Sequence, residues 1–243
     1  MVLSVISCLN MESAIMPWAD AIDIGGIELQ TYYNWVNRGL VFNAGNVKLT
    51  SIAYKAGSLV TKCSFRPGLG FSPYAKLGTA GITLEDGFSG TTWSGTNSAR
   101  LSGAGINYIA GRDASNYYQV VIDAGINYVN SGLDTMNGGG SPQAIKRTLN
   151  LWEIFGSFIF LKPMRVSENV SLAPYGGICL SLYKGGWKDL PASVSYECNS
   201  SSILPVAGLG VYRKNAGLKI EFDFSGGGGP GFSAGLCLCF LDN

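Results

Sequence analysis

The sequence predicts an all-β protein, an antiparallel up-and-down β-barrel that spans a membrane with about ten strands. Three observations predict this fold. Only 14% of the 243 residues are charged while 47% are hydrophobic, which leaves too little charge to cover a soluble domain. No apolar run approaches the roughly 18 residues that a transmembrane helix needs. From residue 27 onward, apolar and polar residues alternate with period two between clusters of turn-forming residues, as strands do.

The alternation is clearest near the C-terminus. In 170–184, Leu180 shares one face with other large apolar residues, and Ser181 falls on the opposite face with small or polar ones. The same rule holds in 218–225 and 232–240. Weaker alternation completes the set of ten, and eight or twelve strands stay open as alternatives. The other seven predicted strands are 27–36, 53–71, 74–84, 99–110, 117–130, 148–161 and 204–213.

The connections between these segments alternate in length, as expected when one end of a barrel carries short turns and the other carries loops. Ser72 and Pro73 are predicted to form a short turn. The predicted long loops are 37–52, 85–98, 131–147 and 185–203. An even number of strands places both termini at the short-turn end. A pentapeptide at 104–108 recurs at 124–128 on the next strand, through hairpin duplication or through chance.

The apolar face is predicted to meet lipid and the charged face to line the lumen. A basic residue on the lipid face costs about 2–4 kcal/mol at mid-bilayer, which fixes the register of the strand that contains Lys219, Glu221 and Asp223. The residues predicted to face the lumen are Lys62, Arg66, Lys76, Asp123, Glu153, Lys219, Glu221 and Asp223.

Aromatic residues near the strand ends are expected to form interfacial girdles. Trp187, at the base of a predicted loop, is interpreted as a further interfacial anchor. The expected girdle residues are Tyr108, Tyr117, Tyr118, Tyr128, Trp152, Tyr212 and Phe240.

The N-terminal region 1–21 is a candidate signal peptide that ends in the small residues around Ala21, which leaves 22–243 as one barrel domain. Cys237 and Cys239 alternate on a predicted strand, where core-filling side chains are a simpler interpretation than a metal pair. No cofactor is expected. The net charge of +1 does not suit a nucleic-acid-binding protein.

The chain contains no histidine, which excludes catalytic sites built on a histidine base and most zinc sites. We therefore expect no enzyme, no catalytic residue and no bound metal.

Three stretches carry a resemblance to a known class of proteins. They are the segments 68–78, 172–177 and 232–240, and together they resemble small bacterial outer-membrane β-barrels, the class that includes the OmpA-like transmembrane domains and other barrels of eight to ten strands. The resemblance covers roughly 22–243 and implies a location in the bacterial outer membrane, with the lipid bilayer as partner. Such proteins usually end on an aromatic residue, whereas here Leu241, Asp242 and Asn243 follow Phe240.

Three functions fit the sequence. The first is a structural or surface-interaction barrel whose charged side chains plug the lumen and whose long loops meet extracellular ligands. The second is a narrow porin-like channel for small solutes, lined by the same charges. The third is a soluble secreted β-barrel or sandwich that binds an apolar ligand.

Overall fold

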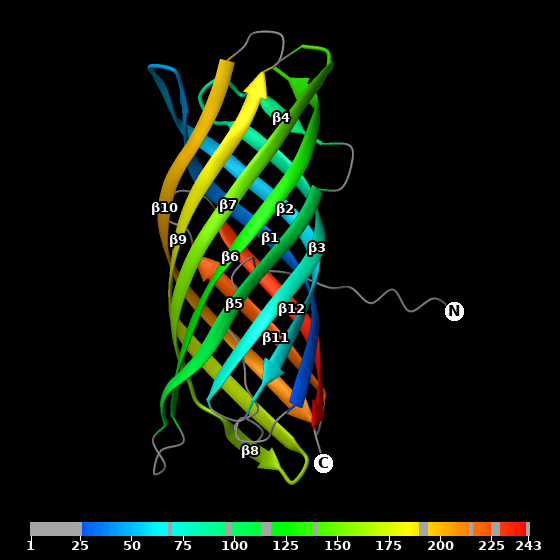
Figure 1. The fold of residues 1–243 in the computed structure, drawn as a ribbon, viewed down its shortest axis with the longest axis vertical. Helices are drawn as coiled ribbons and strands as arrows, with labels where there is room; N and C mark the ends of the chain where they lie inside the picture. The colour runs from blue at the N-terminus through cyan, green and yellow to red at the C-terminus, as the bar shows by residue number, and fades with distance from the viewer. Residues whose placement is uncertain are drawn as a thin grey trace, which may run out of the picture.

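The barrel is described by a computed structural model over residues 26–67, 70–95, 99–112, 118–138, 140–189, 194–213, 216–224 and 229–241. These residues form one antiparallel sheet that closes into a tall barrel, with strands tilted against its long axis (Figure 1). No helix among them is long and apolar enough to cross a membrane. The candidate signal peptide, 1–21, lies outside the described residues.

Ten strands form the wall, so the expected all-β barrel of about ten strands is confirmed. Each of the ten predicted segments corresponds to one wall strand. Two short strands, β4 (Thr92–Ser94) and β8 (Met164–Ser167), complete the sheet. The wall strands are β1 (Gly26–Ala44), β2 (Val47–Arg66), β3 (Phe71–Asp86), β5 (Ala99–Arg112), β6 (Gln119–Asn137), β7 (Gln143–Leu161), β9 (Val170–Asp189), β10 (Val194–Arg213), β11 (Ala216–Phe224) and β12 (Pro230–Leu241).

The barrel closes differently at its two ends. At the end where β1 starts and β12 finishes, which we call the terminal end, β1 pairs with β12 up to Trp35↔Phe232. Towards the opposite end, the far end, β1 pairs directly with β10 around Phe42↔Cys198. The hairpin of β11 and β12 therefore widens only the terminal half. At the far end the wall consists of eight strands, because β11 and β12 do not take part in it. There β4 takes the place of β5 between β3 and β6.

The prediction of four long loops is wrong, because strand continues through most of 37–52, 131–147 and 185–203, and 85–98 contains β4. The strands β1 and β2 meet in a tight turn at Gly45, whose φ of 58° is a left-handed conformation that favours glycine. Ser72 and Pro73, predicted to form a turn, lie inside β3.

The side-chain pattern reverses along long strands such as β1 and β7, which explains the error. In the terminal half of β7, Ile154 and Phe158 are exposed on the outside while Glu153 is buried inside. In the far half of the same strand, Thr148 is exposed on the outside and Leu149 is buried inside. An outer surface in lipid must be apolar, and an outer surface in water must be polar, so the alternation changes phase where the strand leaves the apolar belt.

The interior of the far half is a hydrophobic core. One apolar cluster draws buried side chains from every strand that encloses this half. Trp187 lies at its centre, with ring centroids 4.6 Å from Phe42 and Tyr196 and 5.7 Å from Trp93. The interpretation of Trp187 as an interfacial anchor is therefore wrong. Burial in the same cluster raises the pKa of the Cys198 thiol to about 12.

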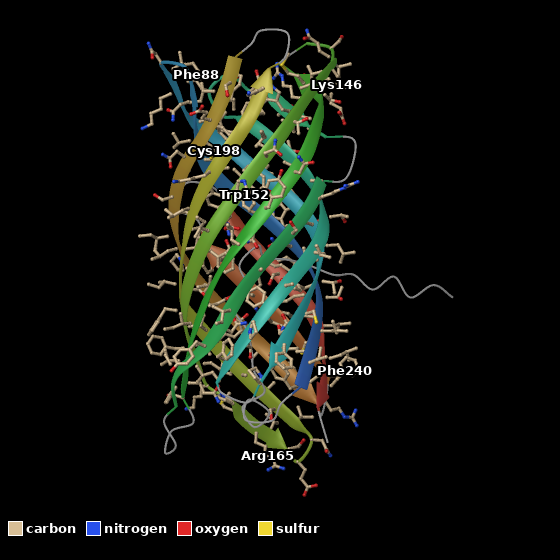
Figure 2. All side chains as sticks on the ribbon, viewed as in Figure 1. Phe88, Lys146, Trp152, Arg165, Cys198 and Phe240 are labelled. Carbon is tan, nitrogen blue, oxygen red and sulfur yellow. The ribbon has the colours of Figure 1, made fainter. Side chains whose placement is uncertain are left out.

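Most of the expected girdle residues lie on the outer surface. Figure 2 shows Phe240 low on the wall and Trp152 higher up, and both side chains are about half exposed. Tyr212 is buried on the lumen side instead, so its assignment to a girdle is wrong. Tyr117 lies outside the described residues.

Candidate functional site

The charged lumen of the terminal half is the candidate functional site. Seven of the eight predicted lumen residues have described side chains; six of them are at most 2% exposed, and the Lys219 side chain is 17% exposed. The side chain of Arg66 lies outside the described part of the chain. The seven residues are Lys62, Lys76, Asp123, Glu153, Lys219, Glu221 and Asp223.

Two further ionisable side chains, Glu28 and Arg38, are buried at 1% and 2% exposure. Both lie on the inward face of β1, in phase with Gln30 and Asn34. Arg38 fell in a segment interpreted as loop, and extending the period-two pattern by one more pair of residues would have found it.

Two tyrosine hydroxyl groups hold two of the carboxylates. The Tyr74 hydroxyl donates a hydrogen bond to Asp123 Oδ1 at 2.9 Å, and the Tyr175 hydroxyl donates one to Glu221 Oε2 at 2.6 Å. All four side chains are at most 7% exposed. Hydrogen bonds to ionised acceptors are among the stronger ones in proteins, so each pair stabilises a carboxylate that water does not reach.

Glycines make room for these tyrosine rings. Gly105 and Gly125 face each other across β5 and β6, and a Cβ atom on either would overlap the Tyr74 hydroxyl. A Cβ atom on Gly208 would overlap Tyr175 in the same way. The repeated pentapeptide therefore has a structural role, since the glycine of each copy contributes to one recess for one ring.

Lysine side chains lie against the two pairs. Lys62 Nζ lies 3.7 Å from the centroid of the Tyr74 ring, and Lys62 also interacts electrostatically with Asp123 and Glu221. Lys219 Nζ lies 3.0 Å from Glu221 Oε2. Buried charges persist when they are paired and hydrogen-bonded in this way.

Two more polar contacts lie between this cluster and the apolar core. Asn127 Nδ2 donates a hydrogen bond to Glu153 Oε2 at 2.7 Å. Arg38 forms an ion pair of 2.6 Å with Asp223 Oδ1, which joins β1 to β11.

In the terminal half the lumen charges nearly balance, with four cations and five anions among the buried or largely buried side chains described there. Within the described ranges, no group of three or more His, Cys, Asp or Glu side chains could hold a metal ion. Cys237 and Cys239 are both buried on the lumen side. Chemically, these residues can fill the interior, balance one another's charges, and connect the strands through hydrogen bonds and ion pairs. The cations are Arg38, Lys62, Lys76 and Lys219, and the anions are Glu28, Asp123, Glu153, Glu221 and Asp223.

No protein-family model matches the chain, and no curated protein is similar enough to match. Among solved structures, the chain resembles the translocator domain of the autotransporter NalP from Neisseria meningitidis, with a TM-score of 0.51, 12% identity and 88% of each chain covered. It also matches the outer membrane protease OmpT from Escherichia coli, at a TM-score of 0.45 and 13% identity over 88% of this chain and 97% of that one. The beta domain of the Bordetella autotransporter BrkA matches at a TM-score of 0.43 and 13% identity, over 90% and 100%.

The likeness to the NalP domain is a likeness of fold. The chain thus has the fold of bacterial outer-membrane β-barrels, and the narrower expectation of an OmpA-like protein stays a prediction.

Proposed function

We propose that this protein is a structural or surface-interaction barrel of the bacterial outer membrane, with an interior that conducts no solute. The fold supports the location, and so does the outer surface of the terminal half. Leu180 is 51% exposed there, whereas its neighbour Ser181 is 1% exposed. A soluble barrel would turn the leucine inward, so the third function considered from the sequence does not fit this arrangement.

One observation carries the proposal of a closed interior: the apolar cluster fills the far half from wall to wall. A solute that entered the charged lumen at the terminal end would meet packed side chains such as Leu151 and Tyr183, each at most 2% exposed. Opening a path through them would require separating well-packed apolar groups, which costs about 2–5 kcal/mol for each large side chain removed from its contacts.

The surface available for interactions is the projecting far half of the barrel. Its outer face carries polar side chains such as Lys48, Glu85 and Lys146, all at least partly exposed. Since the predicted long loops are largely strand, a partner outside the cell would contact a rigid wall and short turns. Rigid surfaces lose little conformational entropy on binding.

Conductance tests the proposal. The protein is folded into detergent, its heat-modifiable migration on a gel verifies the barrel, and it is then inserted into planar bilayers. We expect a silent membrane, with an established porin as the positive control for the assay. Stable current steps from the folded protein would contradict the closed interior and favour the narrow porin-like channel.

A further inference from the structure

Two cysteine thiols lie next to each other on the inner face of β12, the strand that finishes at the terminal end of the barrel (Figure 1). Cys237 and Cys239 are successive inward residues and are 8% and 5% exposed. Neither forms a disulfide. Lys219 and Glu221 lie deeper in the barrel, opposite earlier residues of β12, so an ion that enters at the terminal end reaches the two thiols first.

The geometry of a strand keeps these two thiols from forming a disulfide with each other. Successive residues on one face of a strand have Cα atoms about 6.7 Å apart, and their Cβ atoms point in the same direction. A disulfide needs Cβ atoms about 3.8 Å apart. A protein of the outer membrane passes through the oxidising periplasm, and the pair Cys237 and Cys239 persists there as two thiols because its sulfurs cannot bond directly.

The surroundings of Cys239 are polar. Cys239 lies opposite Glu28 of β1, and its Sγ donates a hydrogen bond to Glu28 Oε2 at 3.8 Å. The Nε2 group of Gln30 donates a hydrogen bond to the other oxygen of this carboxylate. Both Glu28 and Gln30 are at most 8% exposed. The interpretation of the two cysteines as core-filling side chains therefore suits Cys237, which joins an apolar cluster, better than Cys239.

A glycine makes room beside the other thiol. Cys237 pairs with Gly217 of β11. A Cβ atom on Gly217 would lie only 2.8 Å from Cys237 Sγ and would overlap the Tyr212 ring. The glycine thus leaves the Cys237 sulfur free space in which to turn between staggered χ1 positions.

The pair suits a metal ion that binds two sulfur atoms. An ion between two thiolates adds a second bond of about 2.3 Å, and rotation about χ1 of both side chains then closes a gap that one S–S bond cannot. Within the described ranges, no group of three or more His, Cys, Asp or Glu side chains could hold a metal ion, so these residues offer no zinc site of three or four ligands. Thiolates select soft ions such as Cu(I), and Cu(I) and Ag(I) both accept two sulfur ligands in a line.

We propose that Cys237 and Cys239 bind one soft monovalent metal ion, Cu(I) or Ag(I), at the terminal end of the lumen. Both sulfurs bind as thiolates. One thiol proton passes along the hydrogen bond from Cys239 to Glu28, and the other passes to water. One cation therefore enters as one proton leaves, and the charge of the site does not change. This activity goes beyond the proposed structural role and does not depend on whether the lumen conducts.

The test is binding of Ag(I) to the folded protein in detergent micelles, with glutathione as a competing monothiol and native mass spectrometry as the readout. Two linked ligands exceed one by about 10²–10⁴-fold, so Cys237→Ser and Cys239→Ser should each weaken binding by about 100-fold or more. The matched control, Cys63→Ser/Cys179→Ser, removes one exposed and one buried thiol elsewhere and should bind one ion as the unmodified protein does. Heat-modifiable migration on a gel verifies that each variant is folded.

X-ray absorption by the bound silver gives a second readout that needs no variant. The unmodified protein should show two sulfur neighbours around each Ag(I) ion. Unchanged affinity in either single variant, equal loss in the control, or one sulfur neighbour in place of two would overturn the proposal. Binding of Zn(II) as tight as that of Ag(I) would also overturn it, because zinc needs further ligands. Since none of these readouts depends on conductance, the closed interior and the metal site can fail separately.

Discussion

The ion pair between Arg38 and Asp223 offers a measure of how dry the lumen is. Its atoms are 2.6 Å apart, and its side chains are 2% and 0% exposed. Asp223 Oδ2 has no hydrogen-bond partner within the described residues, so Arg38 Nη1 is the group that compensates this carboxylate. In a closed, water-free interior, Arg38→Met should therefore lower the free energy of unfolding by about 3–5 kcal/mol.

The double variant completes the reasoning. Arg38→Met/Asp223→Leu removes both charges and leaves apolar groups of similar size, so its stability should lie close to that of the unmodified protein or above it. Asp223→Leu alone should cost less than Arg38→Met, because Arg38 keeps other contacts. The coupling energy between the two positions should then be large, which additive effects cannot produce.

The assay is reversible urea unfolding in lipid vesicles, followed by tryptophan fluorescence for all four proteins. Lys55 and Glu85 form a matched control pair on the outer surface, with side chains 33% and 38% exposed. Its coupling energy should be at most about 1 kcal/mol. If the cycle at Arg38 and Asp223 gives a value as small as this control, water reaches the pair and the reasoning for a sealed interior is refuted.

Two other predictions test the outer and inner faces of the wall. Leu180→Arg should destabilise the barrel by about 2–4 kcal/mol, because it places a charge in the lipid-facing belt; Thr83→Arg, on the outer face beyond the belt, should change the urea midpoint by at most about 0.5 kcal/mol, and equal effects would argue against the assigned belt. Gly105→Ala should displace Tyr74 from its carboxylate and cost about 1–3 kcal/mol, whereas Gly111→Ala, on the same strand with open space around it, should be tolerated. A tolerated Gly105→Ala would show that the recess is not needed.

The terminal half could be predicted from the sequence because lipid imposes a simple rule on each strand. Leu180 and Ser181 obey that rule, and the same parity places Glu221 and Asp223 inside. Only a strand with apolar residues outside and charges inside satisfies both the bilayer and the lumen, so period two alone determines the register.

The far half could not be predicted in this way because its environment reverses the rule. Leu149 and Thr148 alternate as regularly as residues of the belt do, but the apolar residue faces inward. If lipid is expected outside along the whole strand, this change of phase indicates that the strand has ended. Contacts between distant segments were equally hidden. Nothing in the local sequence of Arg38 indicates Asp223 as its partner, since the contact depends on where the β11–β12 hairpin enters the wall.

That hairpin accounts for the division of the interior into two parts. A barrel of eight strands has an interior that side chains just fill, and the far end, where β1 meets β10, has that number. Insertion of β11 and β12 widens the terminal half beyond what aliphatic side chains can span. Long groups such as Tyr74 and Lys62 occupy the added width, and glycines on the neighbouring strands β5 and β6 make room for the tyrosine ring. These groups carry polar ends, so the wider half needs paired charges, while the narrower half closes with aliphatic and aromatic side chains. The point at which two strands leave the wall therefore determines where the lumen ends.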